Sequence, residues 1–519
     1  MGEYRRSLLT GVSALALALA VSPAFAQKKG GDMIVGVTSP PPLTDAQAST
    51  AEATRNISMH WIETLFARDQ GANPIPDLAT GVEMSPDGLT YVFTLRQGVK
   101  FHNGQEMTSA DVKASLERYK RIGGASLTLS AVNSIEATDK YKVTLKLANV
   151  FPGLLQVISA PGAPMAIYPA SEGQKERDKI AYIGTGPFKW GEYKPDSHVK
   201  LVRNDDYTPN NNYQKRDGFG GKKTAYFDSV TIRFIPEGGA RTAALETGEI
   251  QAVDILPPPA AKRLKGDAKI KIYEATPWLL NLIVFNAGDG PMAQQKLRQA
   301  VLAALDMEEI LAIAGEGNYK LQTAWQYPGS VYHTGDLGKD KYNVKDIALA
   351  KKLVQESGYK GEEIIFLTDS TIKNHNETAV VATEQLKKNL GLNIKLQVVD
   401  WPSASQKRLQ PTGWHMWTVG FGVEPYEGPI NVIGLSTKQN NAMGAQFKAD
   451  PELAAADKLF NSSLKLDDQK KAVLDWTKRM YEWVPAINTG AIGRYQATVA
   501  KVQNYEPNRI PRMWDVWFN

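Results

Sequence analysis

The sequence predicts an α/β protein of two or three lobes, and three observations support this class. At 519 residues the chain is longer than a single hydrophobic core usually organises. Residues 364–367, 378–390 and 394–398 carry the apolar patterns of a strand, a helix and a strand, which predict a βαβ unit with parallel strands. Residues 89–119 alternate as a strand and then continue with helical spacing, which predicts a hairpin that leads into an amphipathic helix.

The first 26 residues have the pattern of an export signal rather than of a folded element. Arg5 and Arg6 form a basic start, an apolar run follows from Leu8 to Val21, and Ala24-Phe25-Ala26 resembles a cleavage site. A retained membrane anchor is the alternative, but the run is shorter than the ~20 residues that a spanning helix needs. We therefore expect the mature chain to be exported to the periplasm by the general secretory route, with the twin-arginine route as the alternative that Arg5 and Arg6 leave open.

Composition excludes several classes of site. The chain contains no cysteine, so disulfides, thiolate metal sites, cysteine nucleophiles and a lipid anchor on cysteine are excluded. The formal net charge is +5, and the basic residues are spread along the chain without a run that would indicate nucleic-acid binding. The six histidines are scattered without a His-x₃-His pair. We expect no cofactor, no bound metal and no nucleic-acid partner.

The elements of the first part follow from local patterns. Met33–Val37 is a short apolar run typical of a buried strand. Asn56–Phe66 has apolar residues at i, i+4 and i+8, which predicts a helix. Thr108 and Asp111 are spaced as a capping box, so a second helix is expected to begin after Thr108. Ser134–Leu147 is predicted to be a hairpin.

The later elements are predicted in the same way. Leu279–Asn286 is an apolar strand. Asp306 and Asn343 are each expected to cap the helix that follows them. The tail Met513–Asn519 is rich in aromatic residues, so we expect it to pack onto the first lobe rather than to extend freely.

The amino-acid identities in this hairpin and helix carry more information than their apolar and polar alternation alone. The chain reads Ser-Pro-Asp-Gly-Leu-Thr-Tyr at 85–91, Phe-x-Leu-Arg-x-Gly-Val-Lys-Phe-His-x-Gly at 93–104 and Thr-x-x-Asp-Val at 108–112. This string closely resembles the segment shared by family 5 extracellular solute-binding proteins of ABC transporters, which include dipeptide, oligopeptide and nickel receptors. Further matches to that family occur at 183–207, 240–250 and 284–306.

The resemblance implies a periplasmic-binding-protein-like fold of the type II, cluster C-like kind. Such a fold has two main α/β lobes joined by a hinge, plus a smaller inserted α+β lobe. The implied segments are the signal peptide at 1–26, a discontinuous first lobe at 27–75, 180–280 and 486–519, an inserted lobe at 76–179, and a second main lobe at 281–485.

A ligand held between two lobes needs a cleft with aromatic side chains and a few oriented polar groups. The segment 413–426 has this composition, because four aromatic residues and one histidine lie among its glycines. The alternative is a core strand followed by a surface loop. Trp278 and Trp401, each beside a strand-like segment, are weaker candidates. The predicted ligand-binding residues are Trp414, His415, Trp417, Phe421, Gly422, Glu424, Tyr426, Trp401 and Trp278.

The same segment departs from the pattern of peptide-binding relatives, in which an aspartate pairs with the α-ammonium group of the peptide. Val423 follows Gly422 here, so that aspartate is missing. A buried ammonium without a partner is costly. Either Glu424 or Glu427 takes the role, or the ligand is not a peptide with a free amine.

The resemblance implies a receptor that binds without catalysing a reaction. It is expected to be a monomer that captures a peptide or similar solute and delivers it to a permease, with energy from partner ATPase subunits, since the chain lacks the Gly-x₄-Gly-Lys-Ser/Thr pattern of ATPases. Alternative ligands are a sugar derivative, an opine or a metal chelate, and direct binding of nickel would depend mainly on His415. Less favoured alternatives are a secreted hydrolase, which would need paired carboxylates, and a chaperone-like module.

Overall fold

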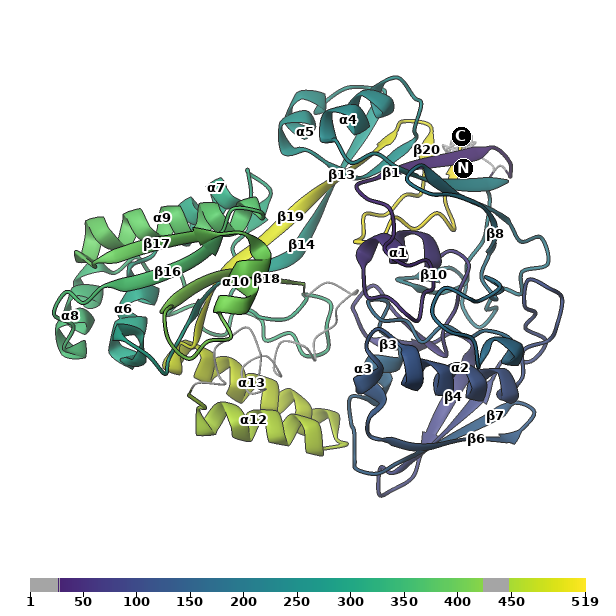
Figure 1. Ribbon diagram of the computed structural model, residues 1–519, viewed down its shortest axis with the longest axis horizontal. Coiled ribbons are helices and arrows are strands. Elements are labelled where there is room, and N and C mark those ends of the chain that lie inside the picture. The colour runs from purple at the N-terminus through teal and green to yellow at the C-terminus, as the bar shows by residue number, and fades with distance from the viewer. Residues whose placement is uncertain (1–26, 28, 423–447) are drawn as a thin grey trace, which may run out of the picture.

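The computed structural model describes residues 27, 29–422 and 448–519, so the predicted signal peptide and residues 423–447 lie outside the described chain. The protein has two halves joined by two long antiparallel strands, β14 (Ile270–Phe285) and β19 (Ala486–Val499) (Figure 1). We call the elements before β14, together with the tail after β19, the first half. The elements between β14 and β19 form the second half. The α/β class predicted from the sequence is confirmed.

One mixed sheet of 11 strands runs through both halves. Its strands lie in the order β17 (Ile394–Val399), β16 (Ile364–Asp369), β18 (Met416–Gly422), β14, β19, β13 (Ala252–Leu256), β1 (Asp32–Val37), β12 (Ser229–Phe234), β9 (His198–Arg203) and β8 (Phe188–Lys194), and β15 (Tyr319–Lys320) pairs with β19. The connecting strands are therefore the centre of the sheet. A movement of one half relative to the other must be absorbed by β14 and β19.

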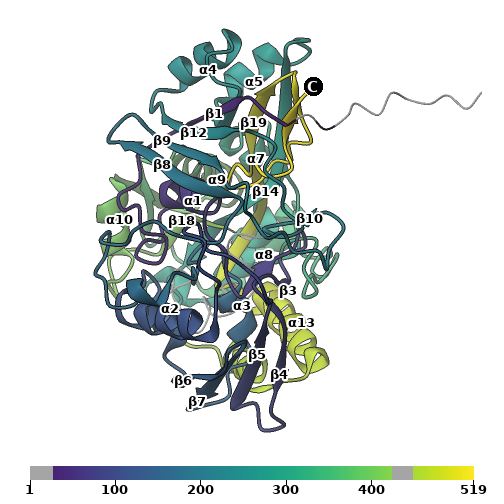
Figure 2. The same ribbon diagram turned by 90° about the vertical axis from the view of Figure 1, so that its right-hand side faces the viewer.

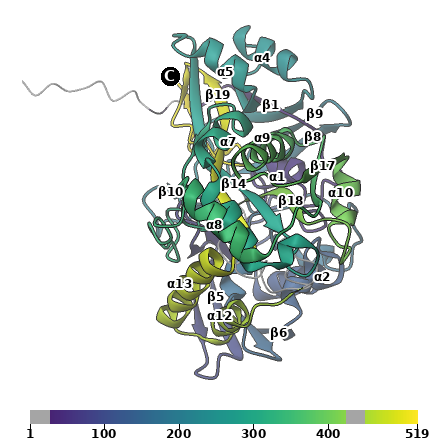
Figure 3. The same ribbon diagram turned by 90° about the vertical axis from the view of Figure 1, so that its left-hand side faces the viewer.

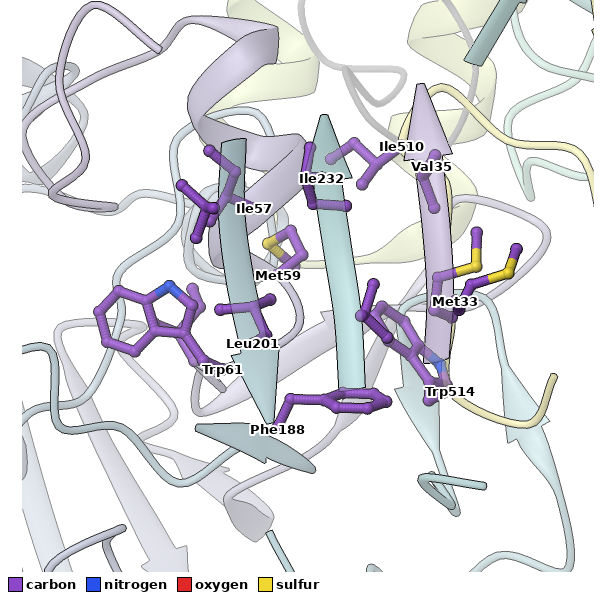
Figure 4. Packing of buried hydrophobic residues seen from close by; sticks show 14 of the residues in the cluster. Met33, Val35, Ile57, Met59, Trp61, Phe188, Leu201, Ile232, Ile510 and Trp514 are labelled. Atoms are coloured by element: carbon purple, nitrogen blue, oxygen red, sulfur yellow. The ribbon is translucent and has the colours of Figure 1, made fainter. Parts of the chain in front are cut away.

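The first half is built around β1, β12 and β9, whose inward side chains pack against the helix α1 (Glu52–Ser58) and the tail (Figure 4). Trp514 and Ile510 of the tail are fully buried in this cluster, which confirms that the aromatic tail packs onto the first half. The other elements of this half outside the smaller sheet are β2 (Phe66–Arg68), β3 (Pro74–Pro76), β10 (Arg216–Asp217), β11 (Gly220–Gly221), α4 (Gly238–Glu246), α5 (Pro258–Leu264), β20 (Val502–Gln503) and β21 (Trp517–Phe518).

The predicted helix over 56–66 is wrong in its extent. The helix α1 ends at Ser58, and the chain turns before Trp61. Ile57, Trp61 and Leu65 are nevertheless buried, as their spacing indicated. The helical spacing thus correctly predicted which side chains face the core. After Ser58, however, turns and not a helix bring these side chains to the core.

The segment 85–112, which carries the family motif, belongs to a separate unit in which a small sheet and a helix share their own core (Figure 2). The Thr108 amide donates a hydrogen bond of 2.8 Å to Asp111 Oδ2, which confirms the predicted capping box. Both strands of the predicted 134–147 hairpin are present and antiparallel. The sheet has the order β4 (Ala79–Met84), β5 (Thr90–Leu95), β7 (Lys142–Leu147) and β6 (Val132–Asp139), and its helices are α2 (Ser109–Ile122) and α3 (Leu154–Ile158).

The second half packs helices on the other end of the large sheet (Figure 3). Strands β16 and β17 are parallel and are connected by α9, which confirms the predicted βαβ unit. The described helices here are α6 (Gln295–Ala304), α7 (Met307–Ala314), α8 (Ile347–Ser357), α9 (Lys373–Leu390), α10 (Trp401–Lys407), α12 (Pro451–Ser462) and α13 (Leu466–Trp483). No helix in the described ranges is both long and apolar enough to cross a bilayer.

The two predicted helix caps in this half had different outcomes. Asp306 caps α7, because its carboxylate accepts the amides of Glu308 and Glu309 at 3.0 and 3.2 Å. Asn343 does not cap α8; that role belongs to Asp346, which accepts the Leu349 amide at 2.8 Å. Asn343 has a positive φ of 54° and accepts the Met307 amide instead.

The halves also touch away from the connecting strands, at the tip of the long loop 321–345. The Val331 amide donates a hydrogen bond of 3.3 Å to Asn73 Oδ1, in the turn between β2 and β3. Next to it Gly329 approaches Gly71 so closely that a Cβ on Gly71 would lie 2.5 Å from the Gly329 carbonyl oxygen. The loop itself is held on the second half, for example by the Tyr332 hydroxyl, which donates to Gln469 Oε1 at 2.7 Å.

Candidate ligand-binding site at the junction of the two halves

The sheet pairing places Trp278 at the junction of the halves. The pairing of β14 with β19 is interrupted between Ala275 and Leu279, and Trp278 lies in this interruption. The next residue, Leu279, pairs with Gly422 of β18 on one side and with Ile492 of β19 on the other. Two of the predicted site residues, Trp278 and Gly422, are thereby brought together from positions far apart in the sequence.

Two arginines lie over the indole of Trp278. The guanidinium carbon of Arg494, on β19, is 3.3 Å from the ring centroid, and that of Arg509, in the tail, is 5.1 Å from it. Such contacts are favourable because the ring face is negative, and more so where water is excluded. Trp278 is only 5% exposed. The indole therefore serves as a platform for cationic groups.

The same two arginines bind Glu52, the first residue of α1. Arg494 Nη1 donates to Glu52 Oε1 and Arg509 Nε donates to Glu52 Oε2, each at 2.8 Å. Burial alone would raise the pKa of the Glu52 carboxyl, but the two guanidinium groups outweigh burial and hold that pKa below its usual value. Glu52 is thus ionised at neutral pH and couples the first half to the connecting strand.

A second carboxylate, that of Asp254 on β13, lies near this cluster without a hydrogen bond. Asp254 is 0% exposed, and neither of its carboxylate oxygens has a hydrogen-bond partner within the described part of the chain. Burial raises the pKa of Asp254 to about 6, against the opposing effect of the Arg494 guanidinium. A charged group in this position is costly to the fold.

The substitution Asp254→Asn is expected to stabilise the protein in a pH-dependent manner. Between about pH 4 and pH 6 the folded protein keeps a proton that the unfolded chain has lost, so the carboxylate lowers the free energy of unfolding as pH rises through this window. Asparagine removes this cost, which amounts to about 1–3 kcal/mol at pH 7.5 and to about a third of that at pH 4.5. Thermal denaturation at both pH values measures the difference, with the exposed Asp267→Asn as the control. An equal gain at both pH values would contradict the assignment.

The predicted aromatic residues of the second half differ in their burial. Trp414 and Trp417 are each 1% exposed and belong to a core cluster, whereas Trp401 and Phe421 pack partly exposed against that cluster. Trp401 stacks on Trp417, with ring centroids 6.2 Å apart and 24° between the ring planes. The two partly exposed rings, Trp401 and Phe421, have surface available to a ligand. Direct contact of Trp414 and Trp417 with a ligand stays a prediction.

His415 is held by the backbone of a neighbouring strand. Its Nδ1 accepts a hydrogen bond of 2.9 Å from the Ile365 amide, and its Nε2 lies 3.8 Å from Asp289 Oδ2. Burial lowers the pKa of His415, so the imidazole is neutral at neutral pH. Glu424 and Tyr426, together with the alternative Glu427, lie outside the described residues, and their roles remain predictions.

A cavity of 570 Å³ lies elsewhere, within the loop of the second half. Lys320, Gln322, His333, Asp336 and Lys339 are among its lining residues. None of the predicted site residues that fall within the described ranges lines it. Its walls come from one loop of one half, so it does not have the two-sided construction expected of a site that closes around a ligand, and we assign it no role.

Sequence reasoning missed Glu52, Asp254, Arg494 and Arg509. These residues are separated by up to 457 positions, and only the fold brings them together. One signal was present: Arg494 is a charged residue inside the otherwise mostly apolar run 486–499. A charge in such a strand must find a partner or serve a function.

Comparison with known proteins places the chain in a family. Residues 73–443 match the family described as bacterial extracellular solute-binding proteins, family 5. The oligopeptide-binding protein AppA of Bacillus subtilis is 28% identical over 476 residues, which are 86% of this chain and 82% of AppA. The glutathione-binding protein GsiB of Escherichia coli is 23% identical over 91% of each chain.

Solved structures agree with this assignment. The ABC transporter substrate binding protein CtaP of Listeria monocytogenes superposes with a TM-score of 0.80, covering 95% of this chain and 100% of CtaP, at 22% identity. AppA of Bacillus subtilis in complex with a nonapeptide superposes with a TM-score of 0.70 over 95% of this chain and 100% of AppA, at 25% identity. The match over most of the chain and the shared fold lead to one conclusion: the protein belongs to the bacterial extracellular solute-binding proteins of family 5.

Proposed function

We propose that the protein is the periplasmic substrate-binding component of an ABC importer, and that it captures a peptide or a similar small solute between its two halves. One observation carries this proposal. Two separately packed halves are joined by β14 and β19, and Trp278, Arg494 and Glu52 meet where these strands leave the first half. A polar cluster on an aromatic platform at such a junction is suited to binding a small solute.

The names of the relatives support a peptide as the ligand without excluding other solutes. AppA of Bacillus subtilis is named as an oligopeptide-binding protein and has been solved with a nonapeptide. Among structures with the same fold, NikA of Brucella suis was solved with Fe(III)-EDTA and AgaA of Agrobacterium tumefaciens with agropinic acid. A sugar derivative, an opine or a metal chelate is therefore the alternative ligand of the same receptor class.

The proposed mechanism is closure of the halves about the connecting strands. A ligand that contacts both halves favours the closed arrangement over the open one by the difference between its affinities for the two. The closed protein then delivers the solute to a permease, whose ATPase subunits supply the energy. The protein acts as a monomer and performs no reaction on the solute.

In this proposal Trp278, Phe421, Trp401 and Gly422 contact the ligand from the connecting strand and from the second half. Glu424 or Glu427 supplies the acidic group for an ammonium if the ligand has one. Trp417 stacks on Trp401 and supports it from the core, whereas His415 lies beyond the end of β18 opposite to Gly422. Direct contact of Trp414, Trp417 and His415 with the ligand stays a prediction.

Native mass spectrometry of the purified protein, followed by calorimetry with a peptide set, sugar acids and metal chelates, tests the class of ligand. We expect a single solute to bind with one-to-one stoichiometry and to raise the melting temperature. Turnover of peptides or glycosides by the purified protein would contradict the proposal, because a receptor releases its ligand unchanged.

Two aromatic substitutions separate binding from packing. Phe421→Ala is expected to weaken ligand binding at least about tenfold while leaving the melting temperature nearly unchanged, because the ring is only partly buried. Trp417→Ala is expected to lower the free energy of unfolding by about 3–5 kcal/mol, because the ring is fully buried. Calorimetric titration and thermal denaturation of both variants measure the two effects. Unchanged affinity in Phe421→Ala would count against its place in the site.

A further inference from the structure

We infer that Arg494 binds a carboxylate group of the ligand and thereby selects acidic solutes. This inference rests on the proposed function, because it names the chemical class that the receptor would take. It starts from the orientation of the guanidinium group. The stacking of Arg494 on Trp278 at 3.3 Å occupies one face of the guanidinium and leaves the hydrogen-bond donors in its plane available.

Only part of that donor capacity is used within the protein. Within the described part of the chain, Arg494 makes one hydrogen-bonded ion pair, in which its Nη1 donates to Glu52 Oε1 at 2.8 Å. The other nearby carboxylate, that of Asp254, forms no hydrogen bond with it. None of the Arg494 nitrogens is both buried and without a partner, and the side chain is 16% exposed. The remaining donors, on Nε and Nη2, therefore reach solvent.

The position of Arg494 places these donors where a ligand between the halves would lie. Glu52 reaches Arg494 from the first half, and Arg494 itself lies on the connecting strand β19. On the side of the second half, β18 ends at Gly422, which pairs with Leu279, the residue next to Trp278. Glu52 and Trp278 hold the guanidinium in place before any ligand arrives. A preorganised donor pays less conformational entropy on binding than a free side chain.

A guanidinium with free in-plane donors matches the geometry of a carboxylate. The fork of two parallel N–H groups binds two oxygens at once, which a lysine ammonium or a neutral acceptor does not reproduce. A neutral analogue would leave partly desolvated donors without a partner. We therefore expect an acid to bind about 10- to 100-fold more tightly than the same molecule with its acid masked as an amide.

The test uses matched pairs of ligands with the full-length mature protein. A set of tripeptides as free acids and as C-terminal amides, with sugar acids and their parent sugars, is titrated by calorimetry. The wild-type protein is expected to prefer each acid that binds over its neutral partner by at least about tenfold. This comparison needs no variant, so it stands even if a substitution at Arg494 disturbs the fold.

Two variants then assign the preference to Arg494. In Arg494→Gln the preference for the acid is expected to disappear, and in Arg494→Lys it is expected to be partly retained, because lysine keeps the charge but not the fork. Arg263→Gln removes an exposed arginine that pairs with Glu246 and is expected to change nothing.

Each outcome bears on the inference. Equal affinity of the wild-type protein for acids and amides, or an unchanged preference in Arg494→Gln, would overturn it while leaving the proposed function intact. Failure of every compound to bind, acidic or neutral, would contradict the proposed ligand class and this inference with it.

Discussion

The substitution Lys223→Met is expected to lower the free energy of unfolding by about 3–5 kcal/mol at pH 8. The Lys223 ammonium donates to Glu63 Oε1 at 3.0 Å and to Asp77 Oδ2 at 3.2 Å, and all three side chains are buried. Methionine preserves most of the apolar stem but removes the charge. Two buried carboxylates would then face each other without the ammonium that bridges them, and with only the more distant Arg96 guanidinium as a counter-charge.

The pH dependence of this loss has a definite sign. Burial raises the pKa of Asp77 to about 6 even with Lys223 beside it, and the neighbouring Glu63 carboxylate contributes to the rise. Without the ammonium the pKa of Asp77 is expected to rise further, so protonation relieves the variant at acidic pH. The loss of stability should therefore be smaller at pH 5 than at pH 8.

Urea denaturation at the two pH values measures the effect, and Lys222→Met is the matched control. Lys222 is the neighbouring lysine, is only partly buried, and has no ion pair recorded among the described residues. We expect the control to change the free energy of unfolding by less than about 0.5 kcal/mol. A loss in Lys223→Met that is equally small would mean that the two acids are already neutral in the fold.

The sequence predicted the local elements well where turn and cap chemistry reinforced the apolar pattern. The capping box of Thr108 and Asp111 and the βαβ unit over 364–398 are examples. Prediction failed for the extent of α1, where spacing alone was used, and for the cap of α8, which is Asp346 and not Asn343. The residues Ile57, Trp61 and Leu65 are buried as expected, yet only Ile57 is helical, while Trp61 and Leu65 follow the end of α1, because burial periodicity does not require helical hydrogen bonds.

The candidate site was predictable only in part for a physical reason. An aromatic residue can fill a core or line a cleft, and the sequence does not distinguish the two. Trp417 and Phe421 therefore looked alike in sequence, although Trp417 is fully buried and Phe421 only partly. The cluster of Glu52, Asp254 and Arg494 depends on the pairing of β13, β14 and β19. No local motif encodes contacts between residues hundreds of positions apart.

The tip of the loop 321–345 gives a second prediction of large effect, on the arrangement of the halves. Gly71→Ala is expected to exclude the contact with Gly329, since the new Cβ would lie 2.5 Å from the Gly329 carbonyl oxygen. Ordinary contact needs about 3.5–4 Å. The backbone of Gly71 does not have a positive φ, so alanine itself is tolerated there. The two backbones must therefore separate, and the Val331–Asn73 hydrogen bond beside them is expected to break.

Because this contact connects the halves outside β14 and β19, its loss should shift the equilibrium between their arrangements. The absence of cysteine allows one spin label to be placed on each half, at Leu127→Cys and Lys352→Cys, both of which are well exposed. Gly71→Ala and Gly329→Ala are expected to add a population with a longer distance between labels. Gly81→Ala, where nothing lies within 4 Å of the new Cβ, should leave the distribution unchanged. If Gly71→Ala and Gly329→Ala behave like Gly81→Ala, the loop tip does not control the separation of the halves.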